Sequence, residues 1–115
     1  MRRLVILSIL SILCLPCVAT AQWTPLPSPT NANLRSVHAF DKVVWVSGDN
    51  GTILRSVDSG TTFAPCSVPK GAEHASLRSI QGIDADTAIV MTPGKGQRSV
   101  LYRTQDGCKT WKRSL

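Results

Sequence analysis

The chain has few of the residues from which metal and cofactor sites are built. Only two of its 115 residues are histidines, and His38 and His74 lie apart without a partner at ligand spacing. Beyond residue 21 there is no C-x-x-C pair and no haem-type C-x-x-C-H motif. Gly94-Lys95-Gly96 lacks the spacing of a phosphate-binding loop. We therefore expect no metal and no cofactor, which disfavours an oxidoreductase.

Acidic residues are also sparse, with seven against 13 lysines and arginines, but the basic excess is mild. The basic side chains are scattered along the sequence. The one loose cluster, Lys95 to Arg98, has no aromatic neighbours that could stack on bases. We expect no nucleic-acid partner.

No apolar run is long enough to cross a bilayer as a helix. The longest, Leu4 to Leu15, has about 12 residues, whereas a spanning helix needs roughly 20. Arg2 and Arg3 precede this run, and Ala19-Thr20-Ala21 follows it as an A-x-A cleavage site. The pattern predicts a signal-peptide helix at residues 1–21, a secreted or periplasmic chain, and no membrane span after cleavage.

The strongest internal signal is a repeat. Leu34-Arg35-Ser36-Val37 recurs as Leu77-Arg78-Ser79-Ile80 at an offset of 43, and the segment 54–58 aligns with 102–106 at an offset of 48. The difference predicts an insertion, for which the stretch 92–99 is the natural place. A period in this range is the blade length of four-stranded propeller repeats.

Each repeat predicts four short strands separated by turn residues. They are expected at 34–40, 43–47, 52–57 and 62–66, and again at 77–83, 87–91, 99–104 and 110–114. Asn50-Gly51 supplies the positive φ angles of a tight hairpin. The predicted fold is therefore all-β: two four-stranded antiparallel propeller blades at 34–70 and 71–115. A Pro-rich leader at 22–33, which holds a candidate closing strand, precedes them.

Both repeats carry a turn motif after the third strand. The segment Ser56-Val57-Asp58-Ser59-Gly60-Thr61-Thr62-Phe63 resembles the Asp box of bacterial neuraminidase repeats, S/T-x-D-x-G-x-T-W/F. The resemblance implies that the aspartate accepts hydrogen bonds from its own hairpin, the glycine is left-handed and the aromatic packs into the blade. The residues given this structural role are Ser56, Asp58, Gly60, Thr62, Phe63, Thr104, Asp106, Gly107, Thr110 and Trp111.

The second copy of the motif departs from the pattern at one place. Cys108 stands where the glycine is usual, and Gly107 lies one residue earlier. This difference leaves the conformation of the second turn open.

Cys66 and Cys108 both lie beyond the predicted cleavage site, in a compartment that permits disulfides. The repeat alignment puts Cys66 in an outer strand of the first blade and Cys108 in a turn of the second. This does not settle whether their α-carbons come within the roughly 7 Å that a bridge requires. A Cys66–Cys108 disulfide and two separate thiols both remain open.

Within Asp-box proteins, the patterns L-R-S-V, V-V-W-V-S-G and G-T-I-L-R-S resemble exported bacterial relatives of the photosystem II stability and assembly factor family. The resemblance implies a β-propeller. Those proteins have six or seven blades, so the two blades found here are expected to be a fragment of a propeller. The resemblance brings no catalytic, cofactor-binding or metal-binding residue to this chain.

These observations favour a non-catalytic scaffold that binds a protein partner or the missing remainder of its propeller. The alternative is a sialidase-like glycoside hydrolase fragment without its catalytic residues. Asp84 and Asp86 lie in a predicted turn, and Tyr102 precedes a strand arginine, so none has a catalytic setting. Enzymatic activity is left undecided, and no catalytic residue is named.

The outer flanks of the blades also predict self-association. Val44, Val46, Ile89 and Met91 are expected on faces that a neighbouring blade would cover. Exposed apolar patches of this kind favour association. A homo-oligomer of stacked blade pairs is therefore expected unless the missing remainder covers them.

Overall fold

The computed structural model describes residues 22–94 and 99–114. Within these ranges the chain forms eight strands and no helix, so the all-β prediction is confirmed. The predicted signal peptide lies outside the described residues, as do residues 95–98 of the predicted insertion. In the described part of the chain, no helix has the length and apolarity needed to cross a membrane.

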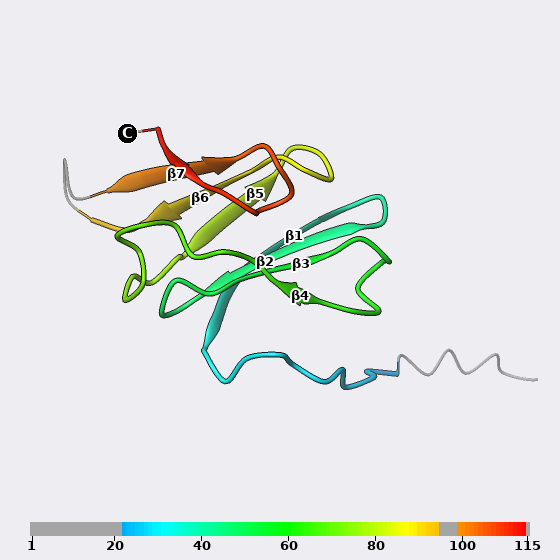
Figure 1. Ribbon diagram of the computed structural model, residues 1–115. Coiled ribbons are helices and arrows are strands. Elements are labelled where there is room, and N and C mark those ends of the chain that lie inside the picture. Colours follow the sequence, from blue (N-terminus) through cyan, green and yellow to red (C-terminus); the bar gives the residue numbers. More distant parts are fainter. Residues whose placement is uncertain (1–21, 95–98, 115) are drawn as a thin grey trace, which may run out of the picture.

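The strands form two four-stranded antiparallel sheets, each in sequential order. The first, blade 1, contains β1 (Leu34–Phe40), β2 (Val43–Gly48), β3 (Ile53–Ser56) and β4 (Ala64–Pro65). The second, blade 2, contains β5 (Ser79–Gly82), β6 (Ala88–Thr92), β7 (Val100–Thr104) and β8 (Lys112–Arg113). The two sheets stack face to face, as Figure 1 shows, and this arrangement confirms the predicted pair of blades.

The fourth strand of each blade is shorter than predicted. β4 and β8 have two residues each, whereas strands were expected at 62–66 and 110–114. The reason is local: Thr62 and Thr110 donate backbone hydrogen bonds to the aspartates of the preceding turns instead of to a strand. A β-ladder can form only after these turns end.

The β2–β3 hairpin has the backbone that its sequence predicts. Asn50 and Gly51 have φ angles of 55° and 65°, which is the conformation that Asn-Gly adopts in a tight turn. A Cβ atom at Gly51 would lie 2.5 Å from the carbonyl oxygen of Ala72. Glycine is therefore required here both for its φ and for the close approach of the segment that joins the blades.

The hydrophobic core lies between the two blades. Because side chains alternate along a strand, one face of each sheet can turn toward the other. Trp45 of β2 is completely buried at the centre of this layer. The buried members of the cluster are Val43, Trp45, Ile53, Ala72, Leu77, Ile80, Ala88, Val90, Tyr102 and Cys108.

The leader, residues 22–33, contains no strand. Residues 26–29 line an apolar pocket of about 160 Å³ together with Val46, Leu54 and Phe63 of blade 1. The expectation that Val46 is exposed is wrong: its side chain is only 8% exposed, because the leader covers this part of the sheet. Met91 on blade 2 is exposed as expected.

Candidate functional site

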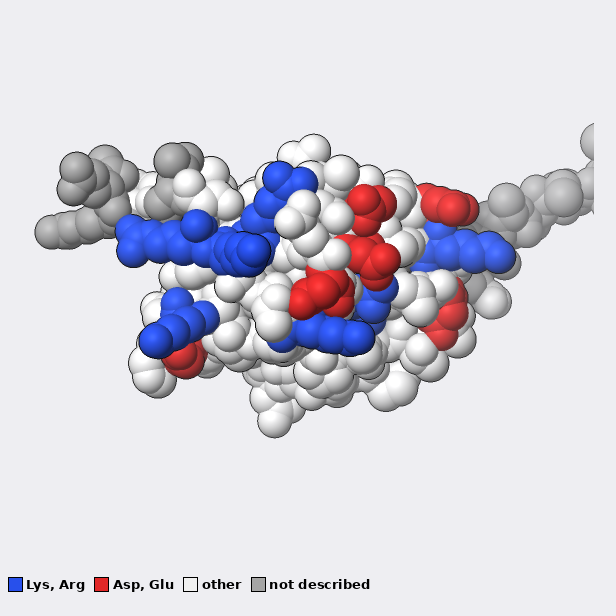
Figure 2. Space-filling view, turned by 45° about the horizontal axis from the view of Figure 1, so that its top comes forward, with Lys and Arg blue, Asp and Glu red and all other residues white. Residues whose placement is uncertain are grey.

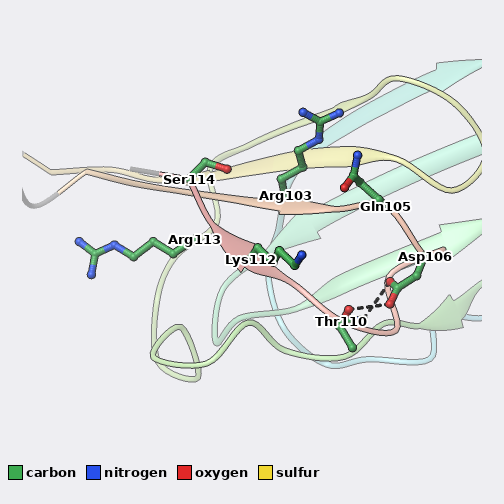
Figure 3. A pocket seen from close by; sticks show the side chains of 7 residues that line it. All are labelled: Arg103, Gln105, Asp106, Thr110, Lys112, Arg113 and Ser114. Atoms are coloured by element: carbon green, nitrogen blue, oxygen red, sulfur yellow. Dashed lines mark hydrogen bonds between the residues drawn. The ribbon is translucent and has the colours of Figure 1, made fainter.

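A groove of about 400 Å³ lies on the face of blade 2 that points away from blade 1. The strand register places Arg103 of β7 opposite Lys112 of β8, so both side chains lie on this outward face (Figure 3). Like charges opposite each other are unfavourable unless an anion lies between them. The residues that line the groove are Arg103, Gln105, Asp106, Thr110, Lys112, Arg113 and Ser114, all of them exposed.

The groove carries a net positive charge, since three of its residues are basic and one is acidic. The Asp106 carboxylate accepts hydrogen bonds from the hydroxyl and backbone N–H of Thr110, and these bonds lower the pKa of Asp106 to about 2. Its oxygens are thereby engaged within the turn. Figure 2 shows a row of basic side chains at the left of that view, whereas in the middle and at the right basic and acidic side chains lie next to each other.

The first turn motif is held by the side chains of Ser56 and Asp58. The Ser56 hydroxyl donates to Asp58 Oδ1 at 2.7 Å and accepts the N–H of Gly60 at 2.9 Å. Asp58 also accepts the backbone N–H of Thr62 at 2.9 Å and the Thr62 hydroxyl. The hydroxyl of Thr62 is the largest cause that lowers the pKa of Asp58 to about 2.

The second turn motif repeats this network in spite of its different sequence. Thr104 Oγ1 donates to Asp106 at 2.9 Å and accepts the N–H of Cys108 at 3.0 Å. The φ angles are 68° at Gly107 and 65° at Cys108, against 61° at Ser59 and 82° at Gly60. Both turns thus use two left-handed residues in succession, and the exchange of the glycine leaves the backbone unaltered.

The aromatic residues that end the two motifs are half-buried. Phe63 lies against the leader in the apolar pocket of blade 1. Trp111 packs against the core and donates its indole N–H to the carbonyl oxygen of Ser67 at 2.9 Å. Each aromatic therefore contacts the segment that precedes the first strand of its own blade: the leader for Phe63, and the segment after β4 for Trp111.

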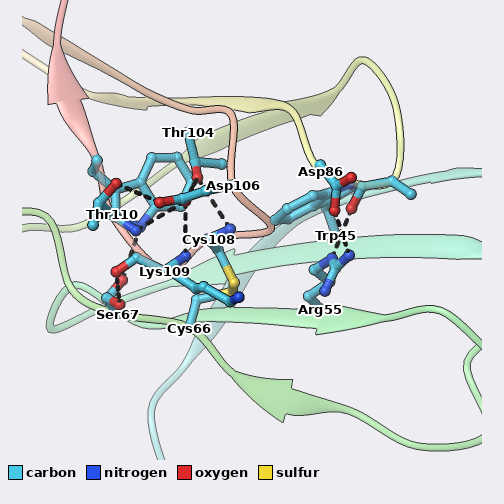
Figure 4. The surroundings of a disulfide bond; sticks show 12 residues. Trp45, Arg55, Cys66, Ser67, Asp86, Thr104, Asp106, Cys108, Lys109 and Thr110 are labelled. Atoms are coloured by element: carbon cyan, nitrogen blue, oxygen red, sulfur yellow. Dashed lines mark hydrogen bonds and ion pairs between the residues drawn. A yellow bond between two sulfur atoms is a disulfide. The ribbon is translucent and has the colours of Figure 1, made fainter.

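A disulfide joins Cys66 to Cys108, with the α-carbons 5.3 Å apart (Figure 4). It links the end of the outer strand of blade 1 to the second turn motif, in blade 2. Ser67 reinforces the junction by donating its N–H to the carbonyl oxygen of Cys108 at 3.1 Å. The sequence left this bridge open, and the structure brings the two cysteines together.

Arg55 makes a further polar link between the blades. Its Nε donates to the carbonyl oxygen of Ala85 at 2.8 Å, and its Nη2 lies 3.2 Å from the Asp86 carboxylate. The guanidinium carbon is 5.6 Å from the ring centre of Trp45, within the range of a cation–π contact. Gly107 lies beside this arginine, since a Cβ there would be 3.3 Å from Nη1.

The residues considered for catalysis or for metal binding have structural contacts. Asp84 Oδ1 accepts the N–H groups of Asp86 and Thr87 within its turn. Tyr102 is buried and donates its hydroxyl to the Lys70 carbonyl at 3.4 Å. His38 Nδ1 accepts the N–H of Gly82. Among the described residues, no group of three metal-ligating side chains comes together.

Sequence reasoning missed the groove. It treated Arg103 as one of several scattered basic residues, although the repeat alignment already paired it with Arg55. Combined with the short spacing to Lys112 and Arg113 across the second turn, that pairing was a signal for a shared basic face. A count of charges along the chain does not reveal this shared basic face.

No protein-family model and no curated protein sequence matches this chain. Among solved structures, the chain is similar to YCF48 bound to D1 peptide, with a TM-score of 0.64 and 18% sequence identity. The match covers 82% of this chain and 31% of that chain, so the chain spans less than a third of the protein it matches. The likeness shows the fold, two blades of a propeller.

Proposed function

We propose that this chain is an exported, non-catalytic scaffold of the Asp-box propeller type, similar to the photosystem II assembly factors, which binds an acidic segment of a protein partner. The observation that carries the proposal is the basic groove on blade 2, with Arg103 and Lys112 side by side and exposed. A similar fold occurs in YCF48 bound to D1 peptide, which supports a peptide or protein as the partner.

A scaffold role agrees with the contacts of the acidic side chains. Asp58 and Asp106 are engaged in their turns, and Asp84 accepts hydrogen bonds from its own loop. A glycoside hydrolase of the usual kind needs two carboxylates placed across a sugar. The described residues offer no such pair in the groove, whose single carboxylate belongs to Asp106.

The test is a titration of the mature chain with a fluorescein-labelled decapeptide of alternating glutamate and serine. We expect saturable binding that weakens as salt is added, because the attraction between exposed charges is screened. The double variant Arg103→Gln/Lys112→Gln should bind at least about tenfold more weakly, since a loss of about 1.4 kcal/mol is tenfold.

The matched control is Arg78→Gln, which removes an exposed arginine outside the groove. It should bind the peptide as the unaltered chain does. Binding that is absent at millimolar peptide, or that Arg78→Gln weakens as much as the double variant, would contradict the proposal.

A further inference from the structure

Each blade has one face in the internal interface and one face that points outward. The outward face of blade 2 resembles the internal face of blade 1, and the outward face of blade 1 resembles the internal face of blade 2. At the internal interface, blade 1 presents the cross-strand neighbours Trp45 and Arg55. The corresponding neighbours on blade 2, by strand order and repeat, are Ile89 and Arg103, which lie on its outward face. Blade 2 therefore presents to solvent the kind of face that blade 1 uses to meet blade 2.

The converse holds for blade 1. Blade 2 meets it with a row that crosses three strands, Ile80, Val90 and Tyr102, all buried. The corresponding row on the outward face of blade 1 is Val37, Val46 and Leu54. Val37 at the end of this row is 65% exposed.

The hydrogen-bonding groups match as well. Inside the molecule, Ser36 Oγ accepts the N–H of Ile80 at 3.2 Å and His38 Nδ1 accepts the N–H of Gly82 at 3.0 Å. The repeat places Ser79 and Gln81 at the positions of these two acceptors, and both are exposed. Each has an oxygen that can accept an N–H from an incoming β1 strand.

The basic groove has an internal counterpart. The surface of blade 1 beside Arg55 corresponds to the groove, and it contacts the turn at Gly107 and Cys108, where the disulfide forms. The turn of blade 1 that corresponds to it is Ser59-Gly60, next to Asp58. This turn is acidic and the groove is basic, so their charges are complementary.

The leader does not obstruct such a contact. Residues 26–29 lie over Leu54 and Phe63 of blade 1. The segment after β4 lies in the same way against blade 2, where Trp111 bonds to Ser67 and Pro69 is fully buried at the interface. The segment after β4 is therefore part of the internal interface, and the leader can take the same place in a contact between copies.

We propose that the partner of the groove is a second copy of this chain, docked head to tail with its blade 1 on the outward face of blade 2. The inference rests on the proposed function, because it fills the same groove. Each copy keeps one face of each kind, so the contact repeats from copy to copy and forms a ring where the rotation between copies closes. Three copies would supply about six blades, a number found in closed propellers.

The contact between copies is weaker than the internal one. Ile89 and Met91 replace Trp45 and Ser47, which donate side-chain hydrogen bonds across the internal interface. No disulfide corresponds to the internal bridge, because the equivalent positions hold Ser114 and Gly60. The assembly is therefore expected to dissociate on dilution.

These two positions provide the test. Ser114 donates its N–H to the carbonyl oxygen of Leu101, just as Cys66 donates its N–H to the carbonyl oxygen of Ile53. The α-carbon of Ser114 is therefore placed in blade 2 as that of Cys66 is in blade 1. We would mix one mature chain carrying Ser114→Cys with another carrying Gly60→Cys under mild oxidation. The expected product is a covalent heterodimer, identified by mass after digestion as a bridge between positions 60 and 114. Adding Arg103→Glu to the Ser114→Cys chain should reduce its yield at least about tenfold.

Wild-type chain in analytical ultracentrifugation provides a second measurement that needs no new cysteine. We expect a mass that rises with concentration toward three copies, and a rise that Arg103→Glu abolishes. A monomer at 100 μM, together with no 60–114 bridge, would overturn the inference. If the labelled acidic peptide still binds such a monomer, the proposed function stands alone; if the peptide also fails to bind, both are wrong.

Discussion

Gly82 lies so close to Trp45 that a Cβ at position 82 would come within 2.4 Å of the indole Cδ1. The indole is completely buried, and its N–H points to the carbonyl oxygen of Asp84 at 3.4 Å. Gly82 pairs with Ala88 across the sheet, so the part of blade 2 that faces Trp45 consists of two small residues. The separation of the blades is thus set by one large side chain against two small ones.

Gly82→Ala should therefore destabilise the chain. Adding a methyl group to a packed contact forces the indole or the strand to shift, and the expected loss is about 1–3 kcal/mol in the free energy of unfolding. Urea unfolding would measure it. Arg78→Ala, an exposed change just before β5, should stay within about 0.5 kcal/mol of the unaltered chain. Equal stability of the Gly82→Ala and Arg78→Ala variants would contradict the contact.

The disulfide should contribute strongly to stability, because its cysteines are 42 residues apart. Cross-linking a loop of this size lowers the conformational entropy of the unfolded chain, which stabilises the folded state by about 4 kcal/mol. We expect Cys66→Ala/Cys108→Ala to lose about that amount in urea unfolding.

The position of Cys108 allows a matched control. Its φ of 65° is unfavourable for a residue with a side chain and costs roughly 1–2 kcal/mol. Cys66→Ala/Cys108→Gly removes the same bridge but relieves this strain, so it should unfold at a higher urea concentration than the double alanine variant. The reverse order would show that position 108 is not left-handed.

Acid should weaken the fold through Asp58 and Asp106. Each has a pKa lowered to about 2 by the hydroxyl and backbone N–H groups of its turn. A carboxylate with a lowered pKa stabilises the folded state above its unfolded pKa of about 4, and that contribution is lost as the pH falls toward 2. Melting temperatures should therefore drop between about pH 4 and pH 2.

Thr62→Val isolates the cause, since the Thr62 hydroxyl has the largest effect on Asp58. The pKa of Asp58, followed by carboxyl NMR, should rise toward its usual value, while that of Asp106 stays near 2. A pKa of Asp58 that does not move would mean that its hydrogen bond to Thr62 is not formed.

Arg55 and Arg103 occupy equivalent strand positions but have different surroundings. Arg55 contacts Ala85 and Asp86 across the interface and Trp45 within its own blade. Arg55→Gln should lower the free energy of unfolding by about 1.5–3 kcal/mol, the range for hydrogen bonds to a charged group. Arg103→Gln should change the stability of the dilute monomer little, because Arg103 is exposed. Equal losses in both variants would contradict this difference.

Export should leave Gln22 as the first residue of the mature chain. The charged start, the apolar run and the A-x-A site at residues 19–21 are the reason. Intact-mass measurement of the chain recovered from the periplasm or medium would establish its terminus. A chain that retains Met1, or that carries a lipid, would overturn the predicted cleavage.

Local patterns were enough to predict most of the strands. β1 begins and ends at the predicted residues, and β2 is longer than predicted by one. Hairpins bring neighbours in sequence together, so alternation and turn residues carry the needed information. The fourth strands were overestimated because the side chains of Asp58 and Asp106 take the N–H groups of the residues expected to begin them.

The contacts between blades could not be predicted in this way. Whether Cys66 meets Cys108 depends on how two sheets stack, and no spacing within one sheet fixes that. The cover over Val46 depends on where the leader turns, which its prolines do not specify. The basic groove was overlooked for a related reason: Arg103 and Lys112 become neighbours only in the β7–β8 register.

The disulfide also determines how the chain responds when it is pulled from its two ends. The bridge spans residues 66 to 108, and β5, β6 and β7 all lie inside the covalent loop that it closes. A stretching force passes through the sulfur atoms and leaves these three strands unextended. At about 3.3–3.6 Å per extended residue, the 42-residue span shortens the reach of the oxidised chain by about 140–150 Å. Reduction would release that hidden length in a single step.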